Sequence, residues 1–269
     1  MEIRIFDVSH GFCAMVATNN GGLAFIDCGH DEDGFKPSSF LRAIGKNRIN
    51  HLVISNFDQD HVSDLHNIRS FAQIDVFHRN RSVSSEYIRL LKLAGGSLTA
   101  AMSSAIDLHK DYIHPVPNPP DMGGVEIAAF HNFYPEFTDT NNLSLITFIT
   151  FDGFTIVFPG DMERAGWLAL LGNANFRDYL SKVNIFVASH HGREGGYCAE
   201  VFDYCSPDII VISDKEIVHD TQQHNKYAPH SAGLVWPGNV IRKVVTTRND
   251  GTIRIFKPMG GNYSVMLNQ

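Results

Sequence analysis

The sequence predicts one α/β (or α+β) domain spanning residues 1–269, in which two β-sheets pack face to face and helices cover their outer faces. Three observations lead to this fold class. The 269 residues are 43% hydrophobic, enough for one sizeable core. The chain divides into two halves, and in each half short apolar strands precede helices. No internal repeat or low-complexity segment suggests a repeat architecture.

The first half begins with three strands separated by turn residues, a pattern typical of a meander. Pro37 and Ser38 are helix-start signals, and Gly45 is a stop signal. A further helix is expected after His61. The predicted strands are 2–8, 12–18, 23–29, 50–55 and 74–78, and the predicted helices are 36–45 and 62–73.

Residues 83–110 are expected to form a helical insertion or a lid. Apolar residues recur at helical spacing in 84–94 and in 99–110, and Gly95-Gly96 interrupts the pattern. The proline-rich stretch "HPVPNPPDMGG" then ends this region with a turn.

The second half contains the strongest hairpin signal of the chain, two apolar runs joined by Asp152-Gly153. A helix at 162–171 follows this hairpin. The remaining predicted strands are 125–131, 183–189 and 207–213, with a closing hairpin over 240–257 around an Asn-Asp-Gly turn.

Composition narrows the function classes. A formal charge of −7 argues against wholesale binding to nucleic acid, although a local basic groove is compatible with it. The four cysteines form no CxxC pair and are expected to be buried thiols. No long apolar run or signal-like N-terminus occurs, so a soluble, cytoplasmic chain without membrane insertion is expected. Candidate phosphate contacts are Arg79, Arg81, Arg242, Lys243 and Arg248.

The stretch "NFDQDH" follows an apolar strand and has the pattern of a metal-binding loop. Asn56, Asp58 and Asp60 are spaced by two residues, so their side chains can converge on one face of an extended loop. His61 adds a donor at the junction with the next helix. The alternative is a solvated turn with an aspartate N-cap.

Two further strands end in residues of the ligand type, which favours a metal site over a solvated turn. Asp161 follows the strand in "TIVFPGD", and His190 and His191 follow the strand in "FVASHHG". Unpaired charges at the ends of buried strands are costly, and a shared metal ion removes that cost.

Taken together, these motifs resemble the metallo-β-lactamase-fold hydrolases, whose signature is HxHxDH followed by later His, Asp and His ligands. More narrowly, the chain resembles the C-terminal hydrolase domain of the DNA-uptake protein ComEC and its free-standing relatives. The resemblance implies a four-layer αβ/βα sandwich. The matching segments occur in family order, and they are "FDVSHGFCAMV", "LAFIDCG", "NFDQDH", "NNLSLITF", "FPGDME", "SHHG" and "TRNDGTIRI".

The resemblance implies that the second metal position of the family is complete. Asp60, His61 and His190 would bind this ion, and Asp161 would bridge two ions where both are present. His191 is the alternative to His190, because the sequence does not say which ring points inward.

The first metal position departs from the family pattern. Asn56 replaces the first histidine, Asp58 occupies the second position, and Asn142 lies near the place of another histidine. We therefore expect one secure ion, with a second that is weak, substrate-assisted or absent. The oxygen-rich donors favour manganese, zinc remains compatible with the histidines, and magnesium and iron are alternatives.

A metal-bound water would be the nucleophile. Asp58 or Asp60 is expected to orient this water and accept its proton. His230, near a histidine of the ComEC-like branch, would donate to the leaving group, or is a structural histidine.

Other polar residues are expected around the ligands rather than on the metal. Asp27 would organise the ligand loop through hydrogen bonds. His10 and His30 follow turns near the first strands. A role in contacting the substrate or in supporting the ligands is one hypothesis for each of them.

Three functions are compatible with these residues. The leading hypothesis is a metal-dependent phosphodiesterase or nuclease, with a phosphodiester or nucleic-acid substrate. The second is a catalytically weakened module of the same fold that binds or regulates together with a protein partner. The third is hydrolysis of a lactam or thioester. The sequence does not fix the oligomeric state.

Overall fold

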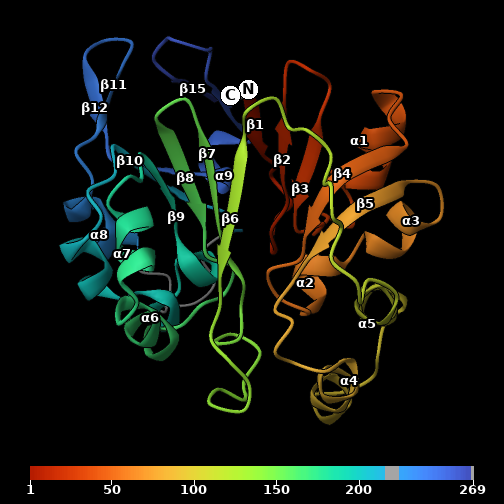
Figure 1. Cartoon of the computed structure of the whole chain (residues 1–269). Helices are drawn as coiled ribbons and strands as arrows, with labels where there is room; N and C mark the ends of the chain where they lie inside the picture. The colour runs from red at the N-terminus through yellow and green to blue at the C-terminus, as the bar shows by residue number, and fades with distance from the viewer. Residues whose placement is uncertain (216–223, 268–269) are drawn as a thin grey trace.

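The computed structural model describes residues 1–215 and 224–267 and confirms the predicted four-layer αβ/βα sandwich. Figure 1 shows the two sheets in the middle, with helices on the outer face of each. The seven-stranded sheet has the order β15-β14-β1-β2-β3-β4-β5, and the six-stranded sheet has the order β13-β10-β9-β8-β7-β6. The core between the sheets includes Ile3, Ile5, Val16, Ile156 and Val211, all fully buried.

The first sheet begins with the predicted meander. Strands β1 (Glu2–Ile5), β2 (Ala14–Ala17) and β3 (Leu23–Ile26) are antiparallel neighbours. Strands β4 (Arg48–Val53) and β5 (Gln73–His78) then continue the sheet in parallel with β3. The carboxyl ends of β3, β4 and β5 therefore lie at one edge of this sheet.

The helices of the first half lie outside this sheet. They are α1 (Pro37–Ala43), α2 (Gln59–Val62) and α3 (Leu65–Arg69). The single helix predicted at 62–73 is wrong in its bounds, because helical structure already begins at Gln59, inside the ligand loop, and breaks between α2 and α3.

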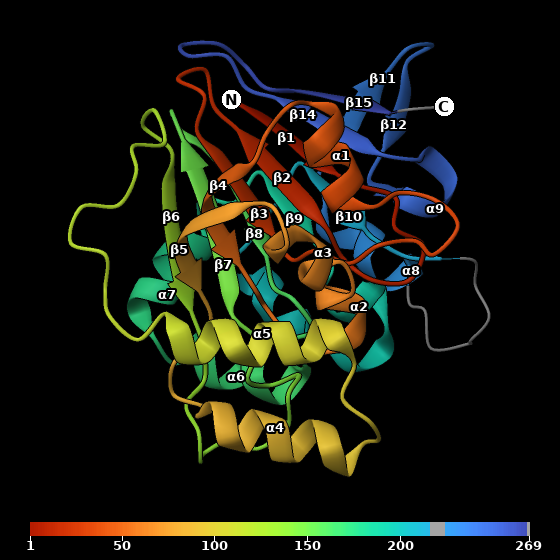
Figure 2. The same ribbon diagram turned by 90° about the vertical axis from the view of Figure 1, so that its right-hand side faces the viewer.

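Residues 83–110 contain the two predicted helices, α4 (Ser85–Ala94) and α5 (Ala100–Asp111). Ser84 caps α4 by accepting a hydrogen bond from the Tyr87 amide, and Thr99 caps α5 in the same way from Met102. Figure 2 shows the two helices side by side at the end of the molecule opposite the N-terminus.

The second sheet contains the predicted Asp152-Gly153 hairpin, formed by β7 (Ile146–Phe151) and β8 (Phe154–Phe158). Both turn residues have positive φ, 51° and 76°, as a two-residue type I′ turn requires. Strand β6 (Glu126–Phe130) pairs with β7, and β9 (Ile185–Val187) and β10 (Ile209–Ile212) run parallel to β8. Helices α6 (Arg164–Leu171), α7 (Ala174–Leu180) and α8 (His224–Tyr227) lie outside this sheet.

The predicted closing hairpin over 240–257 is wrong. Strand β13 (Val244–Thr246) pairs with β10, whereas β14 (Ile253–Phe256) pairs with β1 in the other sheet. The expected turn is instead the short helix α9 (Thr247–Asp250), which Thr246 caps by accepting a hydrogen bond from the Asn249 amide. Helix α9 thus carries the chain from one sheet to the other. Strand β12 (Val240–Arg242) lies within the first arm of that predicted hairpin. The sequence did not predict β11 (Leu234–Trp236) and β15 (Ser264–Leu267).

All four cysteines are free and buried, as predicted. Within the described ranges, no helix combines the length and the apolar character that crossing a membrane would require.

Candidate metal centre

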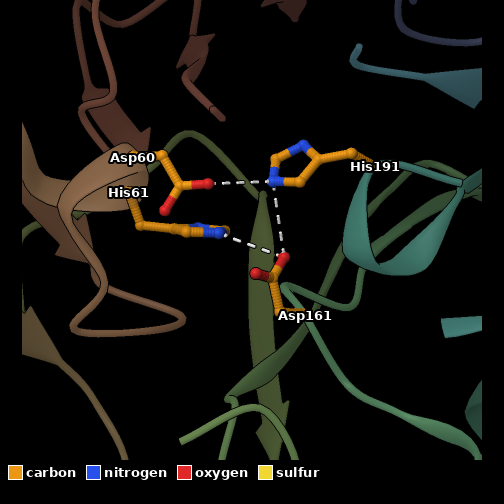
Figure 3. A group of neighbouring side chains, drawn as sticks. All are labelled: Asp60, His61, Asp161 and His191. Carbon is orange, nitrogen blue, oxygen red and sulfur yellow. Dashed lines mark ion pairs between the residues drawn. The ribbon is translucent and has the colours of Figure 1, made fainter. Parts of the chain in front are cut away.

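Four ligand-type side chains converge where the carboxyl ends of strands from both sheets meet. Asp60 and His61 follow β4, Asp161 follows β8, and His191 follows β9. One ligand atom from each lies within 4.8 Å of all the others. Figure 3 shows the four side chains pointing toward one common point from different segments of the chain. Polar sites in α/β proteins commonly form at this end of parallel strands.

Two glycines allow the ligand loop to approach the first sheet. A Cβ atom at Gly29 would lie 2.2 Å from the Asp60 carbonyl oxygen, and one at Gly11 would lie 2.4 Å from the same atom. The Phe12 amide donates to this oxygen at 3.2 Å. Side chains at either glycine would therefore push Asp60 away from the cluster.

Asp27 fixes the orientation of the His61 ring. The fully buried Asp27 carboxylate accepts hydrogen bonds from the Ser55 amide at 2.7 Å and from His61 Nδ1 at 2.7 Å. Because Nδ1 carries the proton of this bond, the lone pair of a neutral ring is on Nε2. That atom lies 3.1 Å from Asp161 Oδ1.

A backbone carbonyl fixes His191 in the same way. His191 Nδ1 donates to the Ser213 carbonyl at 3.0 Å, which leaves Nε2 free to bind a cation. Nε2 lies 3.3 Å from Asp60 Oδ2 and 3.6 Å from Asp161 Oδ1.

His190 points elsewhere, which corrects our preference for it over His191. Both residues have left-handed backbone conformations, with φ of 51° and 55°, and their rings diverge. His190 Nδ1 lies 3.4 Å from Glu163 Oε1 and is not part of the four-residue cluster. No residue pattern in this stretch indicates that turn.

Three buried atoms of the cluster lack hydrogen-bond partners among the described residues. They are His61 Nε2, His191 Nε2 and Asp161 Oδ1. Buried polar atoms are nearly always satisfied, and leaving one unsatisfied is costly. Two imidazole nitrogens with carboxylate oxygens are suitable ligands for zinc or manganese. The donor set therefore fits a divalent cation.

Strong electrostatic interactions among the four side chains are the second sign of a metal site. Burial opposes protonation of His61, yet the carboxylates of Asp161, Asp27 and Asp60 raise its pKa well above the ordinary value. The pKa of His191 is raised too, because Asp161 and Asp60 outweigh its burial. The pKa values of Asp60 and Asp161 are lowered, since the neighbouring imidazoles outweigh burial.

Asn142 does not face the first metal position, contrary to expectation. Its side-chain oxygen accepts from the Gly166 amide at 2.8 Å, and its amide group donates to Asp139 at 3.1 Å. The preceding residue takes its place, because Asn141 Oδ1 accepts a hydrogen bond from Asn56 Nδ2 at 3.2 Å. Asn141 was not predicted, although the pair "NN" offers both residues for this place.

Asp58 lies apart from the four-residue cluster. One carboxylate oxygen pairs with Lys92 Nζ of α4, and the other accepts from Thr140 Oγ1 at 3.1 Å. Lys92 was also missed. Its only signal was its spacing on α4, since Ser85, Ile88 and Lys92 form the buried face of that helix.

A polar pocket of about 770 Å³ opens beside the cluster. His10 lies at its wall, with Nε2 3.4 Å from Asp60 Oδ2. Burial, with the nearby His191, lowers the pKa of His10 to about 4. The lining also includes His30, Asp31, Glu32, Asp33, Asp58, Asn141, Asp161, His190, Arg193 and Lys215.

His230 is not among the residues that line this pocket. Its ring stacks on Phe202 with centroids 4.1 Å apart, and its Nε2 lies 2.7 Å from the Tyr197 hydroxyl. This placement corrects the expectation of a leaving-group donor and agrees with a structural histidine.

The chain is similar to known proteins only at low sequence identity. No protein-family model matches the chain. ComE operon protein 3 of Bacillus subtilis (strain 168) is 23% identical over 240 residues, which are 84% of this chain. The chain spans only 27% of the length of that relative.

Two solved structures illustrate the structural likeness. A diphosphatase of the PhnP family is 11% identical, covers 96% of this chain and 99% of its own, and has a TM-score of 0.47. A metallo-beta-lactamase from Cronobacter sakazakii is 19% identical, covers 71% of this chain and 78% of its own, and has a TM-score of 0.41. At these identities the likeness concerns the fold.

Proposed function

We propose that the chain is a metal-dependent hydrolase that cleaves phosphodiester bonds with a metal-activated water. The observation that carries this proposal is the set of three buried ligand atoms without hydrogen-bond partners, on His61, His191 and Asp161. The substrate class rests on the sequence motifs shared with the ComEC-like hydrolase domain. The match to ComE operon protein 3 is consistent with that narrower resemblance.

His61, His191, Asp60 and Asp161 would hold the ion. When bound, a divalent ion lowers the pKa of a coordinated water and polarises the substrate oxygen. Asp27 and the Ser213 carbonyl keep the two rings in the ligating tautomer. The two rings thus require no change of tautomer to bind a cation.

Asp60 is better placed than Asp58 to orient the attacking water. Asp60 lies in the cluster and also lines the pocket, whereas both carboxylate oxygens of Asp58 are engaged by Lys92 and Thr140. His10, beside Asp60, is neutral at pH 7 because its pKa is lowered to about 4, so it offers an uncharged imidazole at the pocket wall.

The charge of the pocket favours a small diester over a long nucleic acid. Asp31, Glu32 and Asp33 line it and would repel a polyanion. Arg193 and Lys215 also line it and bring positive charge for a single phosphate group. The basic residues considered as phosphate contacts lie outside the lining: Arg79 donates to the carbonyls of Phe77, His109 and Tyr112, and Arg242 pairs with Asp250.

The amides Asn56 and Asn141 favour one competing function. They would leave the fold with weakened chemistry, as in a binding or regulatory module that acts with a partner. If the chain is such a module, the protein should fold but show no turnover. Hydrolysis of a lactam or thioester would use the same ion, so assays with these substrates distinguish it from phosphodiester cleavage.

The test assays the purified chain with bis-p-nitrophenyl phosphate, single-stranded DNA, and chromogenic lactam and thioester substrates, each with manganese, zinc or magnesium. We expect metal-dependent turnover of the small diester that exceeds cleavage of DNA. Asp161→Asn should abolish it, whereas Asp178→Asn, which changes an exposed carboxylate paired with Lys182, should not. No turnover with any ion would favour the binding module, and preferred lactam or thioester turnover would replace the substrate class.

A further inference from the structure

The family pattern implies a first metal position built around residues 56 and 58, and this chain fills that position with its own groups. Asn56 Oδ1 accepts from the Asp58 amide at 3.1 Å, and Asn56 Nδ2 donates to Asn141 Oδ1 at 3.2 Å. Asn141 Nδ2 donates in turn to Glu163 Oε1 at 3.1 Å. Both amide oxygens that could bind a metal therefore already accept hydrogen bonds from the protein.

Asp58, the charged member of this position, is neutralised by Lys92. The Lys92 ammonium contacts one carboxylate oxygen, and Thr140 Oγ1 donates to the other. An ion approaching Asp58 would have to displace a positive charge that is already in contact.

Lys92 reaches Asp58 from a place that normally holds an apolar residue. It shares the buried face of α4 with Ser85 and Ile88, and its side chain is only 7% exposed. Lysine is almost never so buried without a paired charge. This arrangement indicates a specific ion pair rather than a solvated surface contact.

We infer that Lys92 takes the place of the first metal ion, so that the chain holds a single ion at Asp60, His61, Asp161 and His191. The inference rests on the proposed function, and it sets the number of ions at one where the sequence left a weak or substrate-assisted second ion open. Lys92 supplies the positive charge that a first ion would place next to Asp58. As a positioning residue, it also ties α4 to the loop that carries Asp60 and His61.

The inference makes Lys92 and a second ion mutually exclusive, which two matched variants can test. The double variant Asn56→His/Asn141→His restores imidazoles but keeps Lys92. The triple variant adds Lys92→Ala and frees Asp58. Metal-free samples of the wild type and both variants would be loaded with excess Mn²⁺, dialysed, and examined by elemental analysis and electron paramagnetic resonance.

We expect one manganese per chain and the spectrum of an isolated ion for the wild type and the double variant. The triple variant should bind two ions and show the spectrum of a coupled pair. Two ions in the wild type or in the double variant would overturn the inference, and so would a single ion in the triple variant.

The same experiment gives a different result if the four-residue cluster does not bind an ion at all. A wild type that binds no ion would contradict the proposed function, and the ion pair is then tested on the metal-free chain. Lys92→Met keeps an apolar stem but leaves Asp58 unpaired, whereas Arg89→Met removes an exposed cation from the same helix. We expect Lys92→Met to lower the Tm by several degrees more than Arg89→Met, and equal Tm values would overturn the role of Lys92.

Discussion

His61 Nδ1 lies 2.7 Å from a carboxylate oxygen of Asp27, and both side chains are fully shielded from solvent. The same carboxylate accepts hydrogen bonds from the amide and the hydroxyl of Ser55. Asp27 therefore joins the end of β3 to the loop after β4 and sets which nitrogen of His61 faces the cluster. Residues that orient metal-binding histidines in this way contribute strongly to metal affinity.

Replacing Asp27 by asparagine should weaken metal binding without removing a ligand. The single carbonyl oxygen of Asp27→Asn cannot accept from both the Ser55 amide and His61 Nδ1, so the hydrogen bond that sets the tautomer of the ring is weakened. We expect the Kd for Mn²⁺, measured by isothermal titration calorimetry, to rise about 10- to 100-fold. Asp178→Asn, at an exposed pair with Lys182, is the control. An unchanged Kd would show that Asp27 does not orient a ligand.

The neighbouring histidines should differ in their effect on metal binding. His191→Ala removes an inward-facing Nε2 and should raise the Kd for Mn²⁺ by at least about 100-fold, a loss of about 2.7 kcal/mol. His190→Ala removes a ring that faces Glu163 and should change this Kd less than about threefold. The reverse order of effects would restore His190 as the ligand.

These two histidines also show which features of the site can be predicted from the sequence and which cannot. The strands that end at the site, and the residue types at those ends, could be predicted because apolar runs and ligand spacing are local features. Which of His190 and His191, or of Asn141 and Asn142, faces inward depends on backbone turns that change direction within one residue. Tertiary packing sets such turns, and sequence spacing does not encode them.

The same limit explains two features that the sequence did not predict, the helical turn at "TTRNDG" and the ion pair of Lys92. The stretch around "TTRNDG" has hairpin residues, but Thr246 caps a helical turn there, and the flanking strands join different sheets. Lys92 resembles any surface lysine in the sequence. Its role follows only from the packing of α4 against the ligand loop, which brings residues 92 and 58 together across 34 positions.

The stability of the metal-free chain should depend on pH in a defined window. The pKa values of His61 and His191 are raised in the fold, so their contribution is complete below the unfolded value of 6.5 and is lost as pH rises through the raised values. The pKa values of Asp60 and Asp161 are lowered, so their contribution is present above 3.8 and is lost as pH falls below it.

The Tm of the metal-free chain should therefore be highest between these two values and decrease above pH 6.5. Binding of an ion requires deprotonated histidines, so Mn²⁺ should shift the optimum to higher pH and release protons. Differential scanning calorimetry of both forms between pH 4 and pH 9 checks this. Identical pH profiles for the two forms would mean that the ion does not bind these histidines.

The position of the ion is the most direct test of the proposed metal centre. A crystal grown with Mn²⁺ would be examined by anomalous scattering. We predict one strong peak about 2.0–2.3 Å from His61 Nε2 and His191 Nε2, with Asp161 and Asp60 completing the shell. A peak between Asn56 and Asp58 instead, or no peak at the four-residue cluster at saturating Mn²⁺, would contradict the account.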